Sequence, residues 1–252
     1  MYRFLLSRRW LGFAALAVVL AAVMVGLGNW QLDRYHQKVA INDRIDAAAR
    51  AAPVPATDVL RPGDAPAKAQ RYTRVSASGR YDPAHEILVS GRTVDGRVGF
   101  EVLTPLVLPG GAALVVDRGW VAAGAGASDV PAVPAAPGGD VTVLGAVRLP
   151  ERALGRVETL GGRLQVRRIS PAQLAGALPY PVLGGYVTTT QDGLTPIAVE
   201  YEGTLQNGGY ALQWWAFAAL TLVGYGYLAR RHAHESVAQP DDARPSPAPA
   251  AT

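Results

Sequence analysis

The sequence predicts a membrane protein in which two transmembrane α-helices, one near each end, flank an extracytoplasmic, mainly antiparallel β domain. Uncharged apolar runs over residues 10–27 and 210–228 predict the helices. The long segment between them alternates β-branched with polar residues and is large enough to bury one hydrophobic core. We therefore expect a β-rich α+β fold of the barrel or sandwich type.

The first apolar run has the length of a membrane span. Its residues rise about 1.5 Å each and together cover about 27 Å, close to the thickness of the hydrocarbon core. A cleavable signal peptide is the alternative interpretation, because Arg3, Arg8 and Arg9 precede the run and residues 19–21 weakly resemble a cleavage site.

The second apolar run carries aromatic residues near both of its ends, where the interfaces of a bilayer would lie. These residues are Trp214, Trp215, Tyr225 and Tyr227. A buried core helix is the alternative interpretation, but a soluble helix of this length normally shows a polar stripe, and this run shows none.

Lys and Arg residues near the second run predict its orientation. Residues 195–209 before it hold no Lys or Arg, whereas Arg230 and Arg231 follow it directly, and basic residues favour the cytoplasmic side. The first run decides nothing, because three basic residues stand on each side of it. We expect a two-pass protein of the cell membrane with both termini in the cytoplasm and the central domain outside.

Composition divides the rest of the chain. Good helix formers continue beyond the first run until Pro53, and the Pro/Ala-rich residues that follow lack periodicity. The expected segments are the cytoplasmic N-terminus (1–9), the first transmembrane helix (10–28), a helical extension (29–52), a linker (53–71), the β-rich domain (72–205), the second transmembrane helix (210–229) and a disordered cytoplasmic tail (230–252).

Eight strands are expected in the β-rich domain. Residues 95–96 (Asp-Gly) signal a hairpin turn, and residues 124–139 predict a loop. Ser170 can cap a short helix that begins with Pro171 and ends before Pro179. The predicted strands cover residues 72–81, 86–90, 98–108, 113–116, 141–148, 164–169, 186–190 and 197–202.

Composition and motifs exclude several functions. The central region carries a net charge of about +1, which is no nucleic-acid footprint, and the absence of cysteine excludes disulfides, thiolate metal sites and Cys-linked haem. The chain lacks nucleophile-elbow, phosphate-loop and zinc-protease motifs, so we do not expect an enzyme. Asp82, His85 and Glu86 lie close together, but exposed turn residues explain that group.

Three blocks carry a family resemblance: residues 28–38 (GNWQLDRYHQK), 71–121 and 209–218 (GYALQWWAFA). They resemble the Surfeit locus protein family of cytochrome c oxidase biogenesis factors, in particular an actinobacterial-like member, whereas residues 122–185 match little. The resemblance implies a non-catalytic membrane assembly factor or accessory subunit of the respiratory chain. Such a protein assists haem a insertion or maturation of the catalytic subunit of an aa3-type cytochrome c oxidase.

The resemblance also implies partners. They are cytochrome c oxidase subunits, or the respiratory supercomplex that contains them, and the lipid bilayer. Transient contact with haem a is implied, but no tightly bound cofactor. Two alternatives of other classes stay open at this point: a two-pass envelope receptor or solute-binding module, and a membrane-bound envelope enzyme.

The candidate partner-facing or haem-facing residues lie in or beside the three blocks. Trp30, Gln31 and Arg34 share one face of a helix as it leaves the bilayer, so Trp30 would anchor while the other two offer donors to a partner or a haem propionate. Interfacial anchoring with a snorkelling arginine is the alternative. The whole set is Trp30, Gln31, Arg34, Arg92, Gly99, Arg118, Gly119, Trp120, Tyr210, Gln213 and Trp214.

Two interpretations fit the middle block. A backbone bend at Gly119 would turn Arg118 and Trp120 to the sheet edge as a binding rim. Alternatively, Arg118 braces the fold by stacking on a ring or pairing with an acid, and Arg92 and Gly99 brace a hairpin.

The last block contains a polar residue and follows a departure from the family pattern. Gln213 should face the first helix or a partner, unless it meets water at the interface, and Tyr210 and Trp214 lie on the same side. Many family members carry a histidine, a proposed haem ligand, where this chain has Asn207, and an amide is a poor ligand for haem iron. His36 is a weak substitute, so we favour a scaffolding or chaperone role and expect no metal site.

Overall fold

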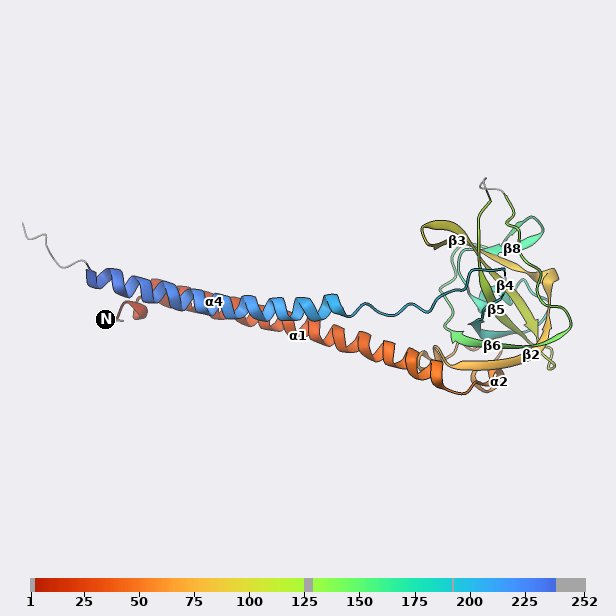
Figure 1. The fold of residues 1–252 in the computed structure, drawn as a ribbon, viewed down its shortest axis with the longest axis horizontal. Helices are drawn as coiled ribbons and strands as arrows, with labels where there is room; N and C mark the ends of the chain where they lie inside the picture. The colour runs from red at the N-terminus through yellow and green to blue at the C-terminus, as the bar shows by residue number, and fades with distance from the viewer. Residues whose placement is uncertain (1–2, 125–128, 192, 239–252) are drawn as a thin grey trace, which may run out of the picture. The chain divides into compact units, whose positions relative to one another are not determined.

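The computed structural model of the protein describes residues 3–124, 129–191 and 193–238 (Figure 1). The chain forms two compact units. One contains Met1–Asn42 and Glu202–Thr252, and the other contains Asp43–Tyr201. The expected division into a helical part and a mainly β domain is confirmed.

The helical unit is built from two long helices. A short 3₁₀ helix, η1 (Arg3–Leu6), precedes α1 (Arg8–Arg50), and α4 (Leu205–Ala238) follows the β domain. By length and composition, α1 is the helix among the described residues that can cross a membrane. The apolar run of α4 is diluted by Gln213 and by tryptophan and tyrosine residues, so composition alone does not identify α4 as a second span.

Within this unit α1 and α4 lie side by side and antiparallel (Figure 1). Near one end the rings of Trp10 and Tyr225 are 6.1 Å apart, and farther along a Cβ on Gly28 would overlap the indole of Trp215. Small side chains let the two backbones approach closely. The buried ones are Ala17, Ala21, Ala211, Ala218, Ala229 and Ala233.

The β unit has nine strands among its described residues. They are β1 (Val54–Pro55), β2 (Arg74–Tyr81), β3 (Ile87–Val94), β4 (Arg97–Val107), β5 (Ala113–Ala122), β6 (Asp140–Arg148), β7 (Glu158–Leu160), β8 (Arg163–Val166) and β9 (Val182–Thr188). Short helices connect them: α2 (Ala56–Val59), η2 (Lys68–Gln70), η3 (Pro83–His85) and α3 (Pro171–Leu174).

The strand order is β1-β2-β6-β9-β5-β4-β3-β8-β7, and an additional β2–β4 pairing closes the five strands β2, β6, β9, β5 and β4 into a barrel. Strands β3, β8 and β7 extend the sheet beyond the barrel. Most pairings are antiparallel, while β1–β2, β3–β8 and β5–β9 are parallel.

Among the described residues, three apolar cores follow from the alternation of side chains along the strands. On β5, for example, Val116 points into the barrel, whereas its neighbour Val115 points into a second core under α3. The barrel core includes Leu60, Val75, Leu106, Leu114, Val143 and Val187. The second core includes Ile87, Leu103, Ile169, Leu174 and Val182, and a third core contains Leu88, Phe100, Val102 and Leu194.

The turn and cap signals are confirmed. Asp95 and Gly96 both have positive φ, 49° and 74°, and join β3 to β4 as the hairpin requires. The Ser170 hydroxyl accepts the Gln173 N–H, and Pro171 is the first residue of α3. The predicted loop 124–139 has no strand in its described part, and residues 125–128 lie outside the described residues.

Several strand bounds differ from the expectation, because β3, β5 and β9 are longer than predicted and β7 was not predicted. Three further differences are larger. Residues 53–71 are not a free linker, because β1 pairs with β2, and Ala56 and Leu60 are buried in the barrel core. The Pro/Ala-rich composition gave no sign of these few apolar contacts. The last strand, predicted at 197–202, does not form. Thr195 pairs with Trp120 as an isolated bridge, and the chain then leaves the sheet.

The third difference concerns the helix ends. The end of α1 belongs to the β unit: Arg74 donates to the carbonyls of Ala49 and Ala51, and the Tyr201 hydroxyl donates to Asp46 at 2.6 Å. At the other terminus α4 continues past residue 229 to Ala238, so the first part of the expected tail is helical. The rest of that tail, residues 239–252, lies outside the described residues.

Candidate functional site

The middle family block forms a β-bulge. The register of β4 and β5 shifts between Val102 and Leu103, so Arg118 is the extra residue of β5. Gly119 adopts φ +138°, and a Cβ there would lie 2.8 Å from both the Leu194 Cβ and the Thr195 carbonyl oxygen. The bulge therefore needs glycine at this position.

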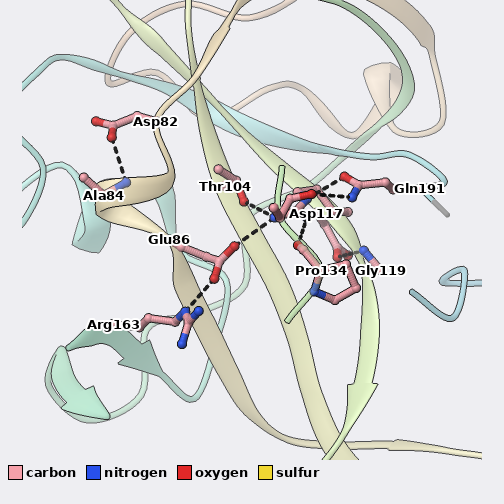
Figure 2. Close-up of polar contacts among 11 residues, drawn as sticks. Asp82, Ala84, Glu86, Thr104, Asp117, Gly119, Pro134, Arg163 and Gln191 are labelled. Atoms are coloured by element: carbon pink, nitrogen blue, oxygen red, sulfur yellow. Dashed lines mark hydrogen bonds and ion pairs between the residues drawn. The ribbon is translucent and has the colours of Figure 1, made fainter. Parts of the chain in front are cut away.

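The bulge directs Arg118 into the domain, where its side chain is completely buried. Its guanidinium donates to Glu86 at 2.8 Å and to the Thr104 hydroxyl at 3.0 Å. Figure 2 shows the second oxygen of Glu86 accepting a bond from Arg163, at 2.6 Å. Burial lowers the pKa of Arg118, and the charge of Glu86 opposes that shift. Glu86 thus holds one cation on each of its oxygens.

Arg118 also ties two loops to the barrel. It donates to the Gln191 side-chain oxygen at 2.7 Å and to the Pro134 carbonyl (Figure 2). Gln191 in turn donates to the Ala135 carbonyl at 3.1 Å. The loop before β6 and the loop after β9 are therefore fixed to one buried side chain.

A second ionic cluster lies around Arg92. Its Nε is 2.9 Å from Glu101, without the alignment of a hydrogen bond, and its terminal nitrogen donates to both oxygens of Glu151 at 2.9 Å. Burial lowers the pKa of Arg92, but the two carboxylates outweigh burial and the pKa is raised. Burial raises the pKa of Glu101, and it raises the pKa of Asp117 well above its usual range, with repulsion from Glu101 added.

The remaining candidates of the middle block interlock with this cluster. Trp120 is 4% exposed and donates from its indole to the Arg92 carbonyl at 3.2 Å. A Cβ on Gly99 would overlap the Trp120 ring, so the two residues pack directly together. The structure thus places Arg118 and Trp120 inside the domain rather than at an exposed rim, in the arrangement of a fold brace.

Glu86 is the important residue that the sequence interpretation missed. It is 5% exposed, not an exposed turn residue, because the chain passes directly from η3 into the buried strand β3. Its position directly before a continuous apolar strand was the sequence signal that could have indicated its burial. Nearby, Asp82 caps η3 and contacts the His85 ring nitrogen at 2.7 Å and the Tyr180 hydroxyl at 3.0 Å.

The helical unit presents a different arrangement, which we call the polar seam: Gln31, Lys38 and Asn42 of α1 with Glu202, Gly203 and Asn207. Asn207 donates to the Gln31 side chain at 2.7 Å, and Lys38 donates to the Gly203 carbonyl at 3.0 Å. Asn42 bonds both backbone groups of Glu202, at 3.0 and 2.8 Å. The spacing of the α1 residues puts them on one helix face.

Other candidates surround the seam with exposed side chains. Trp30 is 57% exposed and Tyr210 is 44% exposed. Arg34 is exposed and contacts Gln37 at 3.3 Å, and His36 is also exposed. Gln213 is exposed on α4 and does not bond α1, whereas Trp214 is half-buried. Among the described residues, no group of His, Asp or Glu side chains is arranged to hold a metal ion.

The first and last family blocks, residues 28–38 and 209–218, lie in contact with each other. Gly28 contacts Trp215, and the Tyr35 ring packs against Gly208. A sequence model of the SURF1 family matches residues 18–219. This chain belongs to the SURF1 family.

Relatives of this SURF1-family chain extend along most of it. Uncharacterized SURF1-like proteins of Mycobacterium tuberculosis and Mycobacterium bovis are each 32% identical over 232 residues, which cover 90% of this chain and 85% of theirs. Surfeit locus protein 1 of Takifugu rubripes is 26% identical over 226 residues, which cover 81% of this chain and 91% of that protein. The expected family is confirmed.

Proposed function

We propose that this SURF1-family protein is a non-catalytic, two-pass membrane assembly factor or accessory subunit for an aa3-type cytochrome c oxidase. In this proposal α1 and α4 both cross the cell membrane, the termini are cytoplasmic, and the β domain is extracytoplasmic. The protein acts by scaffolding the maturation of the catalytic subunit and insertion of haem a.

One observation carries the proposal. The first and last family blocks, separated by most of the chain, come together where Gly28 packs against Trp215, beside the polar seam, and leave Trp30, Tyr210 and Gln213 exposed. An amide exposed on a helix in hydrocarbon needs a partner, because unsatisfied polar groups are costly there. A membrane-embedded oxidase subunit would supply that partner.

The identity and the hydrogen bond of Asn207 favour scaffolding over stable haem binding. Its amide is engaged with Gln31, and an amide is a poor axial ligand for iron. The chain's other candidate ligand, His36, is exposed on the surface of α1. Haem a would therefore pass in transient contact, without a tightly bound cofactor.

The topology is tested with single cysteines, which report cleanly because the chain has none of its own. Ser7→Cys, Leu154→Cys and His234→Cys are each expressed in whole cells and treated with a membrane-impermeant maleimide. We expect labelling of the Leu154 variant alone, since Leu154 is 51% exposed on the β domain. Labelling of the His234 variant from outside would refute the second crossing.

The function is tested by deleting the gene and recording the a-type haem spectrum of the membranes. We expect loss of that signal, its recovery with the complementing gene, and co-purification of oxidase subunits with the tagged protein. A normal spectrum in the deletion strain, with no co-purifying subunit, would refute the proposal.

A further inference from the structure

We propose that the N-terminal half of α1 and the C-terminal half of α4 form a binding site for one anionic phospholipid. The site rests on the proposed function in one respect, because it needs α4 to cross the membrane beside α1. A groove of about 580 Å³ opens between the helices, a volume within the usual range of ligand sites. Its apolar lining includes Phe13, Leu16, Leu20, Leu220 and Leu228.

Gly224 keeps the middle of the groove open. No heavy atom lies within 4 Å of the position that a Cβ would take there. On the facing helix, Ala17 lines the groove with a single methyl group. The two small residues leave space at a depth where the surrounding solvent is acyl chain, so an acyl chain is the apolar group that fits.

Basic side chains stand where a headgroup would lie. Arg231 lines the groove, and the Arg9 guanidinium lies 5.7 Å from the centre of the Phe13 ring, also in the lining. Arg231 pairs with Glu235 at 2.8 Å, but both side chains are more than half exposed. Such a surface pair is weak, so a phosphate can replace the carboxylate.

The balance of charge at this end favours an acidic lipid over a zwitterionic one. Arg8 and Arg230 adjoin Arg9 and Arg231, and Glu235, which lines the groove, is the acidic residue among the described residues of the two helix ends. Guanidinium groups bind phosphate with two parallel hydrogen bonds. Basic pockets between transmembrane helices on the cytoplasmic side bind acidic headgroups for this reason.

Aromatic side chains frame the mouth of the groove. Trp10 contacts the Tyr225 ring, with centres 6.1 Å apart, and the His232 ring, with centres 5.2 Å apart. Tryptophan and tyrosine prefer the headgroup level of a bilayer. Trp10 and His232, which adjoin Arg9 and Arg231 in the sequence, therefore lie at the level where the phosphate would bind.

The test uses the purified full-length protein with equal amounts of phosphatidylglycerol and phosphatidylcholine of matched chains, and native mass spectrometry counts the lipids retained. We expect one phosphatidylglycerol, preferred about tenfold, and loss of that preference in the double variant Arg9→Gln/Arg231→Gln. The control Arg44→Gln/Arg50→Gln removes two arginines from the other end of α1 and should change nothing. Equal retention of both lipids, or an unchanged preference in the first double variant, would overturn the site.

Filling the groove gives an independent variant. Gly224→Leu should abolish retention of phosphatidylglycerol, whereas Gly226→Leu should not, although neither position has an atom within 4 Å of the new Cβ. Retention by Gly224→Leu would overturn the site, as would a dimer that only Gly224→Leu dissociates, because the groove would then hold a second copy. The assay contains no oxidase, so its failure leaves the assembly role standing, and normal oxidase in the deletion strain leaves the lipid site standing.

Discussion

The β domain and the helix pair use their polar residues in opposite ways. In the β domain Glu86 and Arg118 are almost fully buried and bonded to each other. On the helix pair Trp30, Tyr210 and Gln213 are exposed. Both groups belong to the family blocks or adjoin them. The difference teaches that the block residues Glu86 and Arg118 serve the fold of the β domain, whereas the exposed block residues on the helices are the ones that the proposed function would use for a partner.

The variant expected to have the largest effect on stability is Arg118→Met. It leaves Glu86 buried with one cation fewer and releases the two loops that Arg118 holds, so we expect a loss of about 3–5 kcal/mol in the free energy of unfolding. Urea unfolding of the full chain in detergent, followed by near-ultraviolet circular dichroism, measures it. The matched control is Arg80→Met, whose ion pair with Asp140 is mostly exposed and whose loss should cost under about 1 kcal/mol. Equal losses in the two variants would mean that burial of the pair does not matter.

A smaller effect is expected from Gly119→Ala. The new Cβ would meet the Thr195 carbonyl, and the backbone at φ +138° would be strained, at a cost of about 1–3 kcal/mol. Gly110→Ala is the control, because its Cβ meets no atom within 4 Å and its φ is not positive. The same unfolding measurement compares them. If Gly119→Ala had the same free energy of unfolding as Gly110→Ala, the bulge would not depend on glycine.

Local signals predicted the local structure well. The Asp-Gly turn at 95–96 and the Ser170 cap depend on neighbouring residues, and both form as expected. The pairing of β2 with β4, which closes the barrel, depends on residues far apart in the chain and could not be inferred from alternation. The segment 53–71 was missed for a similar reason, since Leu60 gains its burial from strands elsewhere in the sequence.

The candidate site shows the same limit. The sequence located Arg118 and predicted a bend at Gly119, but it left open whether Arg118 faces the sheet edge or pairs with an acid. The acid that pairs with Arg118 lies 32 positions away and was interpreted as a turn residue. Asn207 was identified as a departure from the family pattern. Its hydrogen bond to Gln31 could not be predicted, because it depends on how α1 and α4 pack together in three dimensions.

The pH dependence of stability sharpens the comparison further. The pKa of Asp117 is raised by burial, so the folded state holds this proton more tightly than the unfolded state does. The contribution of Asp117 to stability is therefore fully present below pH 3.8, the ordinary pKa of its carboxyl group. This contribution is lost as pH rises through the raised pKa, with a slope of up to about 1.4 kcal/mol per pH unit. In Asp117→Asn this loss should vanish, so its stability advantage over wild type should grow with pH through that window. Unfolding curves at a series of pH values measure it.

Asp82 has the opposite sign and serves as the control for that measurement. Burial alone would raise its pKa, but hydrogen bonds from His85 and Tyr180 outweigh burial and lower it below 3.8. Its contribution is present above 3.8 and is lost as pH falls through the lowered pKa. Asp82→Asn should therefore be less stable than wild type above pH 3.8, and this deficit should vanish as pH falls through the lowered pKa. An Asp117→Asn advantage that is constant with pH would contradict burial as the cause of the raised pKa.

The smallest effect on folding, and the most specific effect on function, is expected from Gln213→Leu. The side chain is exposed on α4 and bonds nothing on α1, so the free energy of unfolding should change by less than about 0.5 kcal/mol. If its amide bonds a membrane-embedded oxidase subunit, the variant should lose about 1 kcal/mol of that association, and co-purified oxidase should fall about fivefold. Leu212→Ala, at the exposed neighbouring position, changes an apolar side chain instead and should leave the yield of oxidase near that of wild type. An unchanged yield with Gln213→Leu would move the partner surface away from α4, toward Trp30 on α1.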